Sequence, residues 1–128
     1  MRHRRLWPAG AAVPALAAAL VGCGASGAAS AHSAAPIQCG TARTAANVRV
    51  LIEISHGAVA CSTALTVEQA YAAAVAAGKA PGNGGGGPVS VNGWTCLGFD
   101  TPQVLRTGRT SKCTKDGSEI LAVLPSPS

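Results

Sequence analysis

The clearest hydrophobic pattern in the chain lies at residues 47–54, where apolar and polar positions alternate. The β-branched residues of this segment fall on one side of an extended chain: Val48, Val50, Ile52 and Ile54. A period of two is typical of a strand with one buried face. The sequence therefore predicts a half-buried strand, which ends at His56 and Gly57.

The next segment, residues 64–77, has the composition and spacing of a helix. It is rich in Ala, the residue with the highest helix propensity, and Gly78 suits the position after a helix C-terminus. Ser62 or Thr63 is available as the N-cap. The predicted apolar face, which excludes Glu68 and Gln69, consists of Ala64, Val67, Tyr71, Ala74 and Val75.

The remaining pattern predicts strands and turns. Residues 81–88 are rich in Gly and Pro and read as a flexible loop, and residues 89–99 read as a strand region kinked at Asn92-Gly93. Residues 109–114 and 118–124 form a hairpin around Lys115-Asp116-Gly117, because Asp-Gly favours tight turns. The order β-α-β-β-β predicts an α+β domain with one helix packed on a mostly antiparallel sheet. We assign Tyr71 and Phe99 to its core.

The N-terminal residues have the pattern of an export signal. Residues 1–5 are basic and residues 9–21 are almost entirely apolar, a stretch that is too short for a membrane-spanning helix. Leu20-Val21-Gly22-Cys23 closely resembles the lipobox of bacterial lipoproteins, in which the Cys thiol is lipidated before cleavage. We therefore predict a signal peptide over residues 1–22, a lipid anchor at Cys23 and a flexible tether over residues 23–36. A folded domain over residues 37–124 and a disordered tail over residues 125–128 follow.

A second cleavage site competes with the first. The small residues Ala29-Ser30-Ala31 match ordinary signal peptidase cleavage after Ala31, although nine residues separate Ala31 from Val21. Lipidation at Cys23 would place the protein on the extracytoplasmic face of the cell membrane, whereas cleavage after Ala31 would release a secreted protein.

Cysteine parity agrees with export. Setting Cys23 aside leaves four Cys, and an even number in a small exported chain predicts two disulfides. Four Cys allow three connectivities. We prefer Cys39–Cys61 with Cys96–Cys113, since neighbouring strands would bring the second pair face to face. The chain has no Cys-x-x-Cys pair, so we expect neither a metal site nor a cofactor.

Net charge changes little about the expected partners. Loss of Arg2, Arg4 and Arg5 with the signal leaves 7 Lys and Arg against 5 Asp and Glu. The basic pI of the whole chain, about 9.3, is therefore no sign of nucleic-acid binding. The expected partners are the membrane, through the lipid anchor, and an envelope or secreted protein whose identity the sequence does not give.

A search for catalytic chemistry yields no motif. His56 beside Gly57 is interpreted as a turn residue, and no Gly-x-Ser-x-Gly elbow accompanies it. The Gly-rich segment lacks the Gly-Lys-Ser/Thr of a phosphate-binding loop. Trp94 is a candidate ligand contact, with packing against a disulfide as the alternative. The 21 bulky apolar residues between Val48 and Leu124 leave little room for both a core and a large cavity.

Several motifs resemble those of a group of small exported actinobacterial proteins, of mycobacterial and streptomycete type. They are Cys61-Ser62-Thr63-Ala64 before Tyr71, then Gly93-Trp94-Thr95-Cys96, then Cys113 followed by Asp116-Gly117. The resemblance covers roughly residues 48–123. Many members of that group are lipoproteins and most are uncharacterised, so the resemblance implies export but no catalytic residue.

These observations lead to one expectation and two alternatives. We expect a lipid-anchored cell-envelope protein whose small disulfide-bonded domain is a non-enzymatic binding or interaction module. The first alternative is a secreted inhibitor or effector released by cleavage after Ala31, and the second is a small enzyme that acts on cell-wall polymers.

Overall fold

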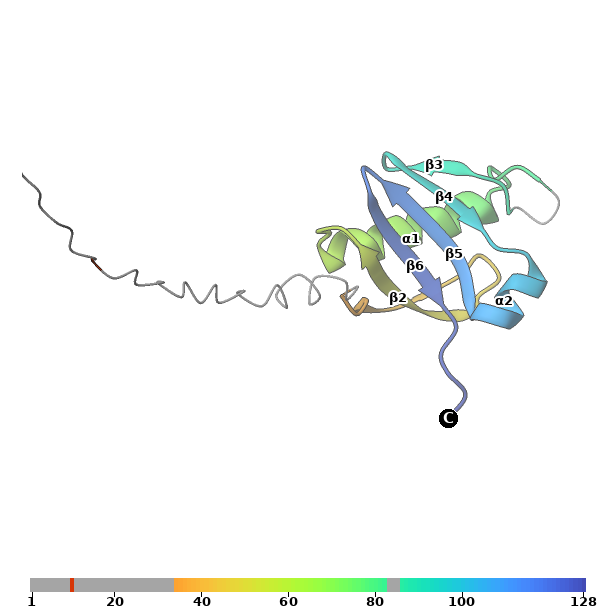
Figure 1. Ribbon diagram of the computed structural model, residues 1–128. Helices are drawn as coiled ribbons and strands as arrows, with labels where there is room; N and C mark the ends of the chain where they lie inside the picture. Colours follow the sequence, from red (N-terminus) through yellow and green to blue (C-terminus); the bar gives the residue numbers. More distant parts are fainter. Residues whose placement is uncertain (1–9, 11–33, 83–85) are drawn as a thin grey trace, which may run out of the picture. The chain divides into compact units, whose positions relative to one another are not determined.

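The computed structural model describes residue 10, residues 34–82 and residues 86–128 of the chain (Figure 1). Residues 34–128 make up one compact unit. Apart from residue 10, the predicted signal peptide lies outside the described residues, as do Cys23, Ala31 and most of the predicted tether. None of the helices in the described part is both long and apolar enough to cross a membrane.

The domain is a mixed α+β structure with one antiparallel sheet of six strands in the order β1-β2-β6-β5-β4-β3. This confirms the predicted fold class. In chain order the elements are β1 (Ile37–Arg43), β2 (Arg49–His56), α1 (Cys61–Ala76), β3 (Val89–Val91), β4 (Trp94–Gly98), α2 (Thr101–Thr107), β5 (Arg109–Lys115) and β6 (Ser118–Val123).

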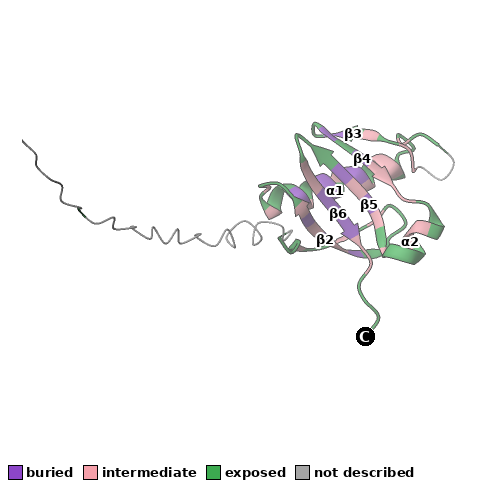
Figure 2. Ribbon diagram, viewed as in Figure 1, coloured by how far each residue is buried: buried purple, intermediate pink, exposed green. Residues whose placement is uncertain are grey.

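Helix α1 lies across one face of the sheet, and the core forms between the two (Figure 1). The alternation in β2 has the predicted effect at Val50, Ile52 and Ile54, which are buried while the residues between them are only partly buried. The predicted place of Val48 on this face was wrong, because Val48 precedes the strand and is 44% exposed. Figure 2 shows that the buried residues gather on α1 and the central strands. The remaining members of the core cluster are Ala64, Val67, Tyr71, Val91, Trp94, Cys96, Cys113, Ile120 and Ala122.

The domain contains two disulfides. Cys39–Cys61 joins β1 to the first residue of α1, and Cys96–Cys113 joins β4 to β5. Cys96 and Cys113 are register partners on neighbouring antiparallel strands, as the preferred pairing assumed. One bridge therefore fixes the helix to an edge of the sheet, and the other lies within the sheet.

The structure corrects the predicted element order by adding strand β1 and helix α2 and by dividing residues 89–99 into two strands. Strand β1 was missed because its residues show no alternation of buried and exposed positions. Its pairing with β2 and the bridge at Cys39 hold it instead. Helix α2 was missed because it has only seven residues, none of them buried. The Asp100 carboxylate caps it by accepting a hydrogen bond from the Gln103 N–H at 2.9 Å, and Gly108 ends it in a left-handed conformation.

The region predicted as one kinked strand is a hairpin. Asn92 and Gly93 both have positive φ and connect β3 to β4 as a tight turn, which matches the Asn-Gly preference of two-residue hairpins. The predicted hairpin of β5 and β6 is confirmed, with Asp116 and Gly117 at its turn. Both turns follow the same backbone rule, which the sequence analysis applied only to the second.

The N-terminus of α1 also differs from the prediction. The helix begins at Cys61, and its N-cap is Ala60, which supplies no side-chain hydrogen bond. Ser62 and Thr63 are therefore inside the first turn and are not caps. The helix starts without a capping side chain, and the Cys39–Cys61 disulfide attaches its first residue to β1.

Candidate functional site

A cavity of about 510 Å³ lies where α1, α2 and the β1–β2 loop meet the sheet. This volume is within the range of roughly 300–1,000 Å³ that is usual for small-molecule sites. Its apolar lining comes from side chains on all of these elements, among them Val48, Tyr71, Val75, Phe99, Val104 and Leu124. The domain thus combines a core with a larger cavity than the count of bulky residues led us to expect.

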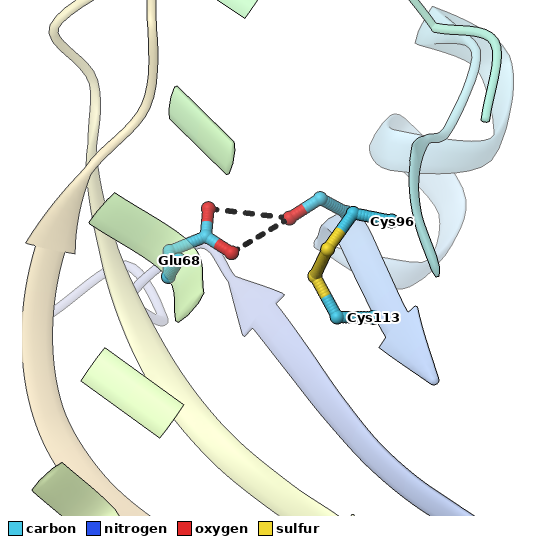
Figure 3. The surroundings of a disulfide bond; sticks show 4 residues. Glu68, Cys96 and Cys113 are labelled. Atoms are coloured by element: carbon cyan, nitrogen blue, oxygen red, sulfur yellow. Dashed lines mark hydrogen bonds between the residues drawn. A yellow bond between two sulfur atoms is a disulfide. The ribbon is translucent and has the colours of Figure 1, made fainter. Parts of the chain in front are cut away.

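Glu68 is the polar centre of this cavity. It projects from α1, is only 2% exposed, and lines the cavity together with Ser111 of β5, which is 4% exposed. The Ser111 hydroxyl lies 3.3 Å from each oxygen of the Glu68 carboxyl group and donates its hydrogen bond there. Figure 3 shows this carboxyl group and its two hydrogen bonds beside the Cys96–Cys113 disulfide.

Burial makes Glu68 hard to ionise. Removal of the carboxyl group from water raises its pKa from 4.5 to about 7, against the smaller lowering effect of the hydrogen bond from Ser111. Burial and, to a smaller extent, the charge of Glu68 also raise the pKa of Tyr71. Near neutral pH the cavity therefore contains a carboxyl group that changes its charge readily.

The prediction that Glu68 lies off the apolar face of the helix was wrong. Ala64, Val67, Glu68 and Tyr71 are the buried residues of α1, and they follow the i, i+3, i+4, i+7 spacing of a single helix face. The spacing alone contains the signal for this position. The position was not predicted as buried because a carboxylate is rarely buried without a partner.

The structure confirms Tyr71 as a core residue but places Phe99 elsewhere. Phe99 is only partly buried, follows the end of β4 and lines the cavity. Its backbone N–H donates to the Thr110 carbonyl oxygen at 3.0 Å, which keeps it beside β5 after the strand has ended. Two of the three aromatic residues in the described part of the chain, Tyr71 and Phe99, therefore line the same cavity.

Trp94, the predicted candidate for ligand contact, does not line this cavity. It is 5% exposed and belongs to the core cluster. Its remaining surface borders a separate, smaller groove of about 290 Å³ next to Thr66 of α1 and Lys115 of β5. A ligand in the Glu68 cavity would meet the side chains of Tyr71 and Phe99 in place of Trp94.

A polar group of residues at the end of β2 has the residue types of a hydrolytic triad but not its geometry. The Ser55 hydroxyl donates to Glu119 Oε1 at 2.6 Å, and His56 Nδ1 lies 3.6 Å from the same oxygen. In a triad the nucleophile donates to the histidine, and the acid holds the other side of the ring. Here both side chains contact the carboxylate, and the His56 side chain is 69% exposed.

Within residues 34–82 and 86–128, no group of three or more His, Cys, Asp and Glu is close enough to hold a metal ion. Comparison of the chain with protein-family models, with curated proteins and with solved structures finds no match. The cavity around Glu68 is therefore the candidate functional site of the domain.

Proposed function

We propose that this chain is an exported, lipid-anchored protein of the cell envelope, and that its domain is a non-enzymatic module that binds a small, largely apolar ligand in the Glu68 cavity. The lipobox-like segment that ends in Cys23 supports export and anchoring. The apolar cavity with its single buried carboxyl group supports the binding role. This cavity is the observation that carries the proposal.

Ligand sites are usually concave and apolar, with few polar groups that fix the orientation of the ligand. The Glu68 cavity has this composition, because aliphatic and aromatic side chains surround the pair formed by Glu68 and Ser111. Val48, which lines the cavity, is 44% exposed, so apolar surface continues outward from it. An apolar ligand would cover this surface.

The domain offers less support for the rival functions. A small cell-wall enzyme needs a nucleophile and a base, or paired carboxyl groups, in one cleft. Glu68 is the only carboxylate among the residues that line the cavity. Ser55 and Glu119 are partly buried, His56 is exposed, and none of the three lines the cavity. Their hydrogen-bond arrangement also differs from that of a triad. For the secreted inhibitor or effector, the distinguishing event is cleavage after Ala31.

The binding role is tested with the neutral fluorescent dye Nile red and the exported chain. We expect saturable binding, and we expect Val104→Trp to abolish it, because Val104 of α2 lines the cavity and a larger side chain would fill it. Leu105→Trp is the matched control, since the neighbouring Leu105 is 80% exposed and does not line the cavity. Dye binding that is absent, or equally strong in both variants, would contradict the proposed site.

A further inference from the structure

We infer that the ligand of the Glu68 cavity has an apolar body and a protonated amine, and that the amine pairs with the Glu68 carboxylate. This inference rests on the proposed function and names the chemical class of its ligand. The hydrogen bonds, the charges and the aromatic side chains of the cavity support it.

The Glu68 carboxylate has few hydrogen-bond donors around it. An ionised carboxylate has two oxygens and accepts up to about four hydrogen bonds. The Ser111 hydroxyl has one hydrogen, and it lies at the same long distance, 3.3 Å, from both oxygens. The carboxylate therefore retains most of its capacity to accept hydrogen bonds, and it retains this capacity inside a cavity. An ammonium group would bring three donors.

The cavity lining supplies no positive charge to pair with the Glu68 carboxylate. The cavity lining contributed by the β1–β2 loop, by α2 and by β4 contains no Lys, Arg or His. The ionisable group that faces Glu68 from its own helix is Tyr71, and β5 contributes the neutral Thr110 and Ser111 to the lining. Burial of a carboxylate without a cation is costly, and the raised pKa of Glu68 reports this cost. A bound cation would offset the cost, whereas an anionic ligand would add to it.

The aromatic side chains of the cavity also favour a cationic ligand. Aromatic residues make up only 3% of the chain, yet Tyr71 and Phe99 both line this cavity. The faces of aromatic rings attract cations, and the attraction is stronger away from water. These side chains would contact both the apolar body of the ligand and its charged end. A neutral apolar molecule would fill the same space but leave the carboxylate without a counterion.

The test compares three ligands with the same eight-carbon body as competitors of Nile red at pH 8. Octylamine is cationic, 1-octanol is neutral and octanoate is anionic. We expect octylamine to displace the dye at a concentration about tenfold lower than 1-octanol, as one additional charge-assisted hydrogen bond would provide. We expect octanoate to be the weakest competitor.

Two variants assign this preference to Glu68. Glu68→Gln keeps the size of the side chain but removes its charge, and it should bring octylamine and 1-octanol to within about twofold of each other. Glu53→Gln makes the same chemical change on β2, outside the cavity, and should keep the preference. Circular dichroism and thermal unfolding of both variants check that the domain has folded before the competition is measured.

A pH comparison on the unaltered protein needs no variant. Lowering the pH from 8 to 5 protonates Glu68, whose pKa is about 7, while octylamine remains cationic. The preference for octylamine over 1-octanol should therefore largely disappear at pH 5. A preference of the same size at both pH values would assign it to a group other than Glu68 and overturn the inference.

The outcomes separate the inference from the proposed function. Absence of dye binding would contradict the proposed binding site, and with it the proposed function. Dye binding with equal competition by octylamine and 1-octanol would support the proposed site but contradict the inference that its ligand carries an amine. Stronger competition by 2-octanone than by octylamine would show that a protonated Glu68 donates to a ligand carbonyl, which would also overturn the inference.

Discussion

Glu68 combines an ionisable side chain with an almost fully buried position, in a domain of few charged residues. Its carboxyl group accepts a hydrogen bond from the Ser111 hydroxyl, and the core of the sheet and helix around it is apolar. A residue of this kind adds little to stability, because a well-packed apolar side chain of similar volume would avoid the cost of its burial. Its position beside a cavity gives it a use in binding instead.

The raised pKa of Glu68 predicts a specific dependence of stability on pH. The pKa is about 7 in the folded domain, above the ordinary value of 4.5, so the folded state binds more protons between these two values. The stability linked to this proton is fully present below pH 4.5 and is lost as the pH rises through 7. Relative to Glu68→Gln, the free energy of unfolding of the unaltered protein should fall by up to about 3 kcal/mol from pH 4 to pH 8.

Thermal or urea unfolding of both proteins at pH 4 and pH 8, without ligand, measures this difference. Glu53→Gln is again the control, because it removes a carboxylate that does not line the cavity. Parallel pH profiles for the unaltered protein and Glu68→Gln would mean that the carboxyl group is more solvated than its position in the structure indicates.

At the level of elements, the sequence predicted the parts of the fold whose residues have a strong local pattern. Alternation identified β2, the Ala-rich segment identified α1, and Asp116-Gly117 identified the turn between β5 and β6. Strand β1 has no such pattern, because it is stabilised by its neighbours and by Cys39. Helix α2 does carry local signals, the cap at Asp100 and the left-handed Gly108, but it lacks a buried face.

The candidate site was harder to predict for the same physical reason. A cavity depends on how separate elements approach each other, and the Glu68 cavity requires α2 and the β1–β2 loop, which the sequence analysis did not define. The position of Glu68 on the buried face was available from helical spacing. Its pairing with Ser111 was not, because 43 positions separate the two residues in the chain.

The two disulfides are expected to differ in their effect on stability. They close loops of similar length, with sequence separations of 22 and 17, so each restricts the unfolded chain by a similar amount, about 3 kcal/mol. Cys96 and Cys113 are also fully buried, whereas Cys39 and Cys61 are only partly buried. Removal of the buried sulfurs would leave unfilled space in the core.

We therefore expect the double substitution of Cys96 and Cys113 by Ala to lower the free energy of unfolding by about 1–2 kcal/mol more than the same change at Cys39 and Cys61. Urea unfolding of the two double variants provides the comparison, and each serves as the control for the other. The opposite order would show that the attachment of α1 to β1 matters more than packing around the disulfide within the sheet.

For the whole molecule, the pairing of the cysteines bears on the compartment in which the chain would act. Four of the five Cys are paired in the two disulfides, which leaves Cys23, in the lipobox-like segment, as the remaining one. Disulfides persist in oxidising compartments. A lipid anchor at Cys23 would keep the domain close to the membrane surface, where apolar molecules with a cationic group concentrate because the membrane attracts both of their parts.

The location of the chain is tested by mass spectrometry of its N-terminal peptide, with membrane and culture fractions of the native host kept separate. We expect the membrane fraction to contain a peptide that begins at a diacylglyceryl-modified Cys23. Cys23→Ala should remove this peptide while both disulfides remain, since Cys23 belongs to neither of them. A free N-terminus at His32 in the medium would overturn the anchor and favour the secreted inhibitor or effector. In that case the Glu68 cavity would bind its ligand in solution, and the dye and amine measurements would apply to the released domain without change.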